Sequence, residues 1–131
     1  MKDEPLPEHL AAYFTCEPPP GGLPACFAVV TAHNPDGVVQ GAAANEAADE
    51  ALGIILDARG LPRFRVTGRS RDGAHREPGW GIATGSLEQA RDFSLAFRQL
   101  AFFWVEDGMV YVVNTKGGLR HPVGRWSERL L

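Results

Sequence analysis

The run from Ala25 to Ala32 constrains the fold of this chain more than any other stretch. Its residues, ACFAVVTA, are small, apolar or β-branched throughout, and no charged side chain interrupts them. Such a run is typical of a strand that is buried on both faces, in the middle of a sheet. The run is followed by Asn34-Pro35-Asp36-Gly37, whose composition predicts a type I turn.

The segments after this turn alternate between helical and strand periodicities. From Ala42 to Arg59, alanine, leucine and isoleucine recur every three to four residues and a Gly-x-Pro sequence follows, so we predict a helix there. Residues 63–67 alternate with period two, which predicts a half-exposed strand with Phe64 and Val66 facing inward and the arginines facing outward. The other predicted elements are a strand at 80–84, a helix from Ser86 to Ala101, and strands at 102–106 and 109–114, joined by the hairpin turn Asp107-Gly108.

This order of elements, βαββαβ with one more strand, is that of a ferredoxin-like plait. We therefore predict an α+β fold: a split βαβ plait with an added C-terminal hairpin strand and a short N-terminal helix from Pro5 to Phe14. Because crossover connections are right-handed, the strands of the plait should be ordered 4-1-3-2, with the fifth strand outside the fourth. Both long helices would then cover one face of a mostly antiparallel sheet.

Length and composition indicate a single domain. A chain of 131 residues with 44% hydrophobic residues can bury a core without metal ions or disulfides. We expect the core to span residues 25–114. A helix and a proline-rich connection (1–24) should precede it, and a tail (115–131) should follow, in which Trp126 and the final leucines predict a last helical turn.

Charge and cysteine usage argue against several classes of function. The net charge of -3 argues against non-specific binding to nucleic acid or to an anionic membrane. No run is long and apolar enough for a membrane span, and the N-terminus lacks the apolar core of a secretion signal, so we expect a cytoplasmic protein. Cys16 and Cys26 match no metal spacing and the histidines are scattered, so we predict no metal and no cofactor. The two thiols should be reduced, with a loop-closing disulfide as the alternative.

The predicted topology gathers polar residues at one end of the sheet. The end of the first strand, the start of the first helix, the loop before residue 80 and the end of the second helix all meet there. Helix N-termini carry free N–H groups, and residues 63–76 contain five arginines, so this end should bind a small anionic or polar ligand. The candidate ligand-binding residues are His33, Asn34, Asn45, Arg69, Glu77 and Gln99.

Most of these residues also have a purely structural interpretation. The arginines could be solvated charges that protect an edge strand, and Asn34 could bond the backbone of its own turn. Glu77 could organise its loop, and Gln99 could cap a buried backbone group. The sequence leaves these alternatives open.

A combination of short motifs carries a family resemblance. The motifs are FAVVTAHNP at residues 27–35, Asn45 in the following helix, the pair Glu77-Pro78, and FRQLAFFW at residues 97–104. Together they resemble a bacterial family known as domain of unknown function 3293, over roughly residues 27–113. That family has no assigned activity, so the resemblance implies no catalytic residues. The positions that match its pattern are Thr31, Ala32, Asn34, Pro35, Asn45, Glu77, Pro78 and Gln99.

These observations favour a small binding module over an enzyme. One alternative is a hydrolase-type enzyme in which His33 and Glu77 act as acid and base. A second alternative is a protein-interaction module. It would use an open sheet edge, formed by residues 63–67 or 109–114, or the exposed face of the sheet, and a homodimer fits this alternative. The sequence identifies neither a ligand nor a partner.

Overall fold

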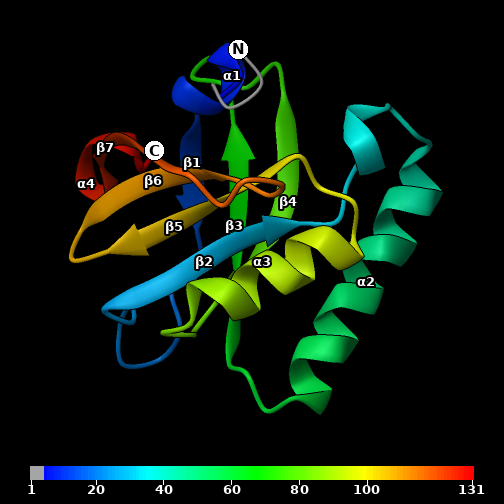
Figure 1. Cartoon of the computed structure of the whole chain (residues 1–131), viewed down its shortest axis with the longest axis horizontal. Coiled ribbons are helices and arrows are strands. Elements are labelled where there is room, and N and C mark those ends of the chain that lie inside the picture. Colours follow the sequence, from blue (N-terminus) through cyan, green and yellow to red (C-terminus); the bar gives the residue numbers. More distant parts are fainter. Residues whose placement is uncertain (1–4) are drawn as a thin grey trace.

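The structure is a computed structural model that describes residues 5–131. This part of the chain contains one seven-stranded antiparallel sheet and four helices (Figure 1), so the predicted mixture of α and β structure is confirmed. The strands are β1 (Tyr13–Cys16), β2 (Cys26–Thr31), β3 (Arg63–Arg69), β4 (Arg76–Ile82), β5 (Ala101–Glu106), β6 (Met109–Asn114) and β7 (Arg120–Arg125). The helices are α1 (Pro7–Leu10), α2 (Ala42–Ala58), α3 (Leu87–Ala96) and α4 (Trp126–Arg129), with a 3-10 turn at Pro35–Gly37.

The strand order is β1-β3-β4-β2-β5-β6-β7, and every neighbouring pair is antiparallel. The four central strands therefore stand in the order predicted from right-handed crossovers, with β6 outside β5. β2 lies between β4 and β5, and its residues Phe27 to Val30 are all buried, as the continuous apolar run predicts. Among residues 5–131, no helix combines the length and the apolar composition that crossing a membrane requires.

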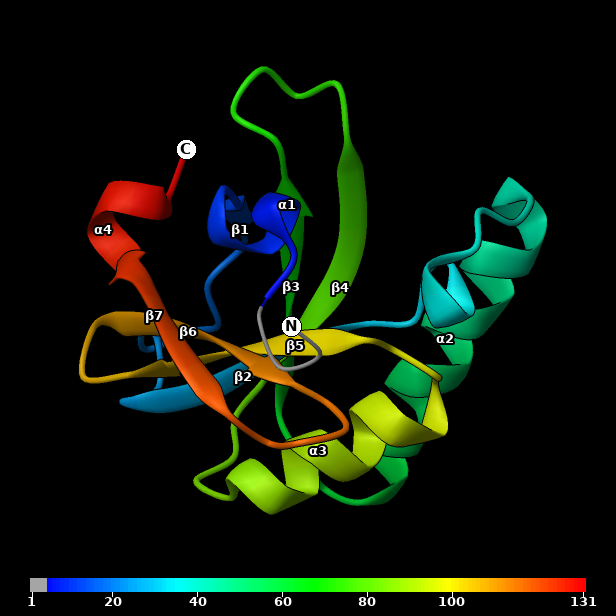
Figure 2. The same ribbon diagram turned by 45° about the horizontal axis from the view of Figure 1, so that its top comes forward.

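A hydrophobic cluster lies on each face of the sheet. On one face lie α2 and α3 (Figure 2). They contribute residues such as Leu56 and Phe93 to the cluster there. On the other face, Phe14 and Trp126 pack against apolar residues of β2, β3, β5 and β6. The sheet curls around this second cluster, so that its two ends approach each other. Phe14 of β1 forms a parallel bridge with Leu130, which follows α4.

The N-terminal helix is shorter than predicted. α1 ends at Leu10, and Tyr13 and Phe14 belong to β1, which pairs with β3. The ring of Phe14 is fully buried and stacks on Trp126, with a centroid distance of 5.3 Å. Burial of a large aromatic ring outweighs the weak helical preference of a few residues. The prediction that the helix reaches Phe14 is therefore wrong.

Both strands that were predicted as open edges have a neighbour on each side. β3 lies between β1 and β4, and β6 lies between β5 and β7. β7 is absent from the prediction because its sequence, RHPVGR, contains proline and glycine, which strands disfavour. It pairs with β6 on both sides of a shift in register between Val110 and Tyr111. The interpretation that residues 63–67 or 109–114 offer an open edge to a partner is wrong.

The turn after β2 is not of type I. Its third residue, Asp36, has a φ of 58° and a ψ of 18°, in the left-handed region, whereas type I requires a φ of about −90° there. The N–H of Asp36 donates to the carbonyl oxygen of Arg98 at 2.7 Å, and the Asp36 carboxylate pairs with the Arg98 guanidinium. The composition of the turn predicts neither its left-handed conformation nor these contacts with Arg98, which lies far along the chain.

Candidate functional site

A cavity of about 510 Å³ lies on the sheet face that is opposite to α2 and α3. Its floor is formed by Val29 of β2, Gly68 of β3, Gly79 of β4 and Phe103 of β5. Helix α1 and the residues next to it form one wall. The corner between β2 and α2 forms the opposite wall.

Two glycines shape the floor of this cavity. A Cβ atom at Gly79 would lie 2.8 Å from the carbonyl oxygen of Val30, so the close approach of β4 to β2 requires glycine there. A Cβ atom at Gly68 would have the carbonyl oxygen of Glu77, at 4.0 Å, as its nearest contact within the described chain. Gly68 therefore borders open space, and a larger side chain at this position would project into the cavity.

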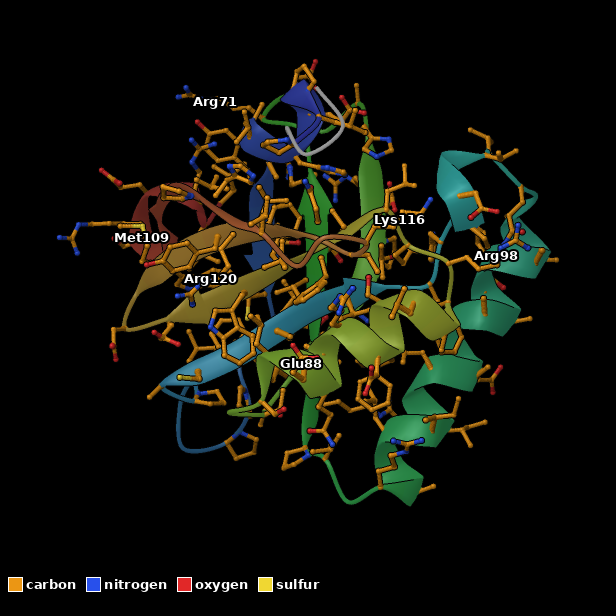
Figure 3. The ribbon with its side chains drawn as sticks, in the orientation of Figure 1. Arg71, Glu88, Arg98, Met109, Lys116 and Arg120 are labelled. Atoms are coloured by element: carbon orange, nitrogen blue, oxygen red, sulfur yellow. The ribbon has the colours of Figure 1, made fainter. Side chains whose placement is uncertain are left out.

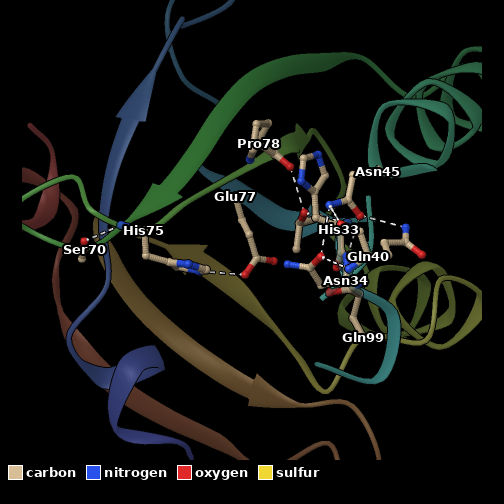
Figure 4. Close-up of polar contacts among 10 residues, drawn as sticks. His33, Asn34, Gln40, Asn45, Ser70, His75, Glu77, Pro78 and Gln99 are labelled. Atoms are coloured by element: carbon tan, nitrogen blue, oxygen red, sulfur yellow. Dashed lines mark hydrogen bonds and ion pairs between the residues drawn. The ribbon is translucent and has the colours of Figure 1, made fainter. Parts of the chain in front are cut away.

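Glu77 and His75 form the polar end of the cavity. Glu77 is at the start of β4, and His75 comes just before this strand. Because the two residues are two positions apart, their side chains lie on the same face of the sheet. His75 Nε2 lies 2.9 Å from Glu77 Oε2, and the backbone N–H of His75 donates to Ser70 Oγ at 3.0 Å. The side chain of Glu77 is 28% exposed and that of His75 is 61% exposed. Figure 4 shows the Glu77 carboxylate between His75 and the corner at Asn34.

Three amide side chains, Asn34, Gln40 and Asn45, hold the corner between β2 and α2. Asn45 Oδ1 accepts hydrogen bonds from the N–H of Asn34 at 2.9 Å and from Gln40 Nε2 at 2.8 Å. Asn34 Oδ1 accepts hydrogen bonds from Asn45 Nδ2 and from the N–H of Gln40, both at 3.1 Å. The network is closed around Asn45, which is 9% exposed (Figure 4). It holds Asn34 in a left-handed conformation with a φ of 49°.

The backbone of His33 ties this corner to the segment after α3. Gln99 Nε2 donates to the carbonyl oxygens of His33 at 3.0 Å and Phe97 at 3.1 Å, which orients the amide. Thr31 Oγ1 accepts the N–H of His33 at 3.1 Å and donates to the carbonyl oxygen of Pro78 at 2.8 Å. The hydroxyl of Thr31 thus has no free donor, whereas the Gln99 amide retains its oxygen as an acceptor.

His9 lies on the wall that α1 forms. Its ring meets Phe103 edge to face, with the ring centroids 6.2 Å apart. Burial lowers the pKa of His9, against the raising effect of the Glu8 and Glu77 carboxylates. Its Nδ1 atom is buried and has no hydrogen-bond partner among residues 5–131. The neutral imidazole is therefore the favoured form of His9 at neutral pH.

The sequence model of a family described as "Protein of unknown function (DUF3293)" matches residues 30–102, more than half of the chain. The chain belongs to the DUF3293 family. This confirms the resemblance that the motifs carry. No curated protein and no solved structure matches the chain. The DUF3293 region includes the corner at Asn34, Glu77 and Gln99, whereas His9 lies outside it.

The structure of this DUF3293 protein brings four of the six predicted site residues together around the cavity: Asn34, Arg69, Glu77 and Gln99. The other two, His33 and Asn45, do not line it. His33 contributes its backbone to the corner, and Asn45 supports Asn34 from behind.

The arginines that the sequence clusters before residue 80 do not converge on the cavity. Arg63 and Arg65 each form a two-point ion pair with an aspartate of α2, on the helix-covered face. Their guanidinium groups lie 4.1 and 3.6 Å from the ring centroid of Trp80. Arg69 lines the cavity, but its guanidinium donates to carbonyl oxygens of its own loop at 3.0 and 3.1 Å. The local excess of positive charge is therefore divided between the two faces of the sheet.

Two histidines of the cavity, His9 and His75, are absent from the predicted site. The spacing of His75 and Glu77 could have indicated a shared face, because residues two apart point to one side of a strand. That inference requires a strand that begins at Arg76 and not at residue 80. No sequence signal indicates His9, because α1 reaches the cavity only through tertiary packing. Within residues 5–131, no group of three histidine, cysteine, aspartate or glutamate side chains could hold a metal ion.

Proposed function

We propose that this protein is a binding module for a small molecule that enters the cavity between α1 and the sheet. The observation that carries this proposal is the cavity itself. Its volume of about 510 Å³ is within the range of small-molecule sites. Its floor is largely apolar, and three of the polar residues that line it, Asn34, Glu77 and Gln99, come from three separate segments. A few polar groups in an apolar cavity are typical of sites that orient a ligand.

Of the two ligand classes that the sequence suggests, polar and anionic, the cavity favours the polar class. Glu77 places a carboxylate at the polar end, and Arg69 donates hydrogen bonds within its own loop. An anionic ligand would meet two carboxylates, those of Glu8 and Glu77, against the single guanidinium group of Arg69.

Backbone strain at the corner supports a function there. Within residues 5–131, four non-glycine residues have a positive φ, and three of them, Asn34, Asp36 and Arg98, meet at this corner. Each left-handed residue of this kind costs about 1–2 kcal/mol, and the hydrogen bonds around it must offset that cost. A wall that is held rigid in this way reduces the entropy lost when a ligand binds.

We further propose that β2, α2, β3, β4, α3 and β5 form a ferredoxin-like plait within a single domain. The strand order β3-β4-β2-β5 and the antiparallel pairing support this assignment. The N-terminal segment α1-β1 and the C-terminal segment β6-β7-α4 are then additions at the two ends of the plait. They cover the face opposite to the long helices, and the N-terminal addition supplies the wall with His9.

The binding function can be tested with a ligand-observed NMR screen of small organic fragments against three proteins: wild type, Gly68→Val and Gly85→Val. Gly68→Val should abolish binding, because valine suits a strand and would fill open space in the cavity. Gly85→Val is the matched control, since Gly85 does not line the cavity and a Cβ atom there meets nothing within 4 Å. Thermal melting verifies that both variants fold.

Two results would refute the binding function. One is a screen in which no fragment binds the wild-type protein. The other is a set of fragments that bind Gly68→Val as tightly as they bind the wild type.

A hydrolase-type activity is the second candidate, and the pair of His75 and Glu77 favours it. The sequence suggests His33 as the partner of Glu77, but the imidazole that Glu77 contacts, at 2.9 Å, is that of His75. A carboxylate that orients an imidazole is a common arrangement of a general base. This candidate predicts hydrolysis of small activated esters that is lost in His75→Gln and retained in His33→Gln. Equal rates for the two variants would exclude it.

A further inference from the structure

We propose that the ligand of this cavity carries an ammonium-type head group on an apolar body, and that the head group binds at the Glu77 carboxylate. The inference rests on the proposed binding function and specifies the ligand class of the same site. Three properties of the cavity support it: its free hydrogen-bond acceptors, its charge and its apolar floor.

The polar end of the cavity offers acceptors. Within residues 5–131, Glu77 Oε2 is paired with His75, and Glu77 Oε1 accepts no hydrogen bond. The amide nitrogen of Gln99 donates to two backbone carbonyls, so its oxygen is the atom that remains for a ligand. An ammonium group has three donors and no acceptor, and it therefore complements these two acceptor oxygens.

The charges around the cavity favour a cation. The carboxylates and guanidinium groups that line it belong to Glu8, Arg69 and Glu77. The two carboxylates outnumber the one guanidinium group, which donates to its own loop, and burial lowers the pKa of His9, which favours its neutral imidazole. The side chain of Glu77 is only 28% exposed. A carboxylate that has lost part of its water gains more from a counter-ion than one on the open surface.

The apolar lining of the cavity selects for an apolar body. This lining includes Val29 and Phe103 of the floor and Leu6 and Ala12 of the wall at α1. Aromatic rings such as that of Phe103 also attract organic cations through their π faces. A bare inorganic cation would leave this apolar surface without a partner, whereas an organic amine can cover it.

The test compares three probes that share one apolar body: phenylethylamine, phenylethanol and phenylpropanoate. Their dissociation constants are measured by NMR titration for the wild type, Glu77→Gln and Glu88→Gln. We expect the amine to bind the wild type about tenfold more tightly than the alcohol, with the carboxylate weakest. Glu77→Gln should weaken amine binding about tenfold and alcohol binding by less. Glu88→Gln is the control, because Glu88 is exposed on α3, which covers the opposite face of the sheet (Figure 3).

The inference and the proposed function fail in different ways. The inference is overturned if the amine does not bind, if the alcohol or the carboxylate binds as tightly, or if Glu77→Gln retains the preference for the amine. If the inference is overturned but the probes that bind the wild type do not bind Gly68→Val, the cavity is still supported as the binding site. The proposed function itself fails if every probe that binds the wild type also binds Gly68→Val unchanged.

Discussion

At the scale of single residues, the side chain of Asn45 lies at the centre of the corner between β2 and α2. It makes four hydrogen bonds, to Asn34 and Gln40. Asn45→Ala should lower the free energy of unfolding by about 1–3 kcal/mol, because polar groups of both neighbours lose their partner. Urea denaturation measures this loss.

Gln40→Ala is the matched control for this variant. It should cost less stability, since Asn45 keeps both of its hydrogen bonds with Asn34. An Asn45→Ala variant that is as stable as the wild type would show that the corner does not depend on this network.

His9 should make the stability of the fold depend on pH. Burial lowers its pKa from the ordinary value of 6.5, so the unfolded chain binds a proton at a higher pH than the folded chain does. As the pH falls through about 6.5, the free energy of unfolding should therefore decrease, until the folded protein also binds the proton. The His9→Phe variant should lose less stability than the wild type between neutral and mildly acidic pH, as measured by urea denaturation. Identical losses for the two proteins would rule out a buried neutral His9.

At the scale of elements, α4 joins the two ends of the curled sheet. Arg129 Nη1 donates to the carbonyl oxygens of Leu10 at 3.1 Å and Ala12 at 3.2 Å, and its Nη2 donates to that of Val123 at 3.1 Å. The N–H of Leu131 donates to the carbonyl oxygen of Phe14 at 2.8 Å. These bonds connect the N-terminal wall of the cavity to β7 and the C-terminus of the chain.

Arg129→Met should therefore destabilise the protein by about 1–3 kcal/mol, since three backbone carbonyls lose a charged donor. It should also increase hydrogen exchange at the amides of β1 more than at those of β2. Lys116→Met is the control, because Lys116 is an exposed cation in the turn after β6 (Figure 3). Unchanged exchange in β1 would mean that α4 does not hold that strand.

At the scale of the whole molecule, the strand order separates the two thiols. Cys16 is on β1 and Cys26 is on β2, with β3 and β4 between them, which corresponds to roughly 14 Å at the usual strand spacing. A disulfide requires Cα atoms about 4.4–6.8 Å apart. Both cysteines are free, and burial together with nearby carboxylates raises the pKa of both thiols.

We therefore expect no intramolecular disulfide when the native protein is treated with a mild oxidant. Alkylation of both thiols should be slow at neutral pH and fast in denaturant, because the thiolate is the reactive form. Mass spectrometry of the alkylated protein measures both properties. An intramolecular Cys16–Cys26 disulfide formed under native conditions would contradict the strand order.

The central part of the fold could be predicted because its signals are local and strong. The apolar run at 25–32 indicates a central strand, and the helical stripes and the hairpin turn define its neighbours. With right-handed crossovers, these elements permit few strand orders. The same topology placed Asn34, Glu77 and Gln99 at one end of the sheet, where they line the cavity.

Periodicity and chain handedness thus determined the order of the central strands and the end at which the polar residues meet. They could not determine the second face of the sheet. β1 and β7 are four and six residues long, too short for a local preference to define them. The sequence predicts a last helical turn at Trp126, where α4 begins, but it does not predict that Trp126 stacks on Phe14.

Contacts between distant segments likewise have no local signal, so only the tertiary structure shows that His9 lines a wall of the cavity. It also shows that Arg63 and Arg65 pair with aspartates of α2. Finally, it shows that Glu77 faces the cavity, whereas Asn45 is enclosed in a hydrogen-bond network.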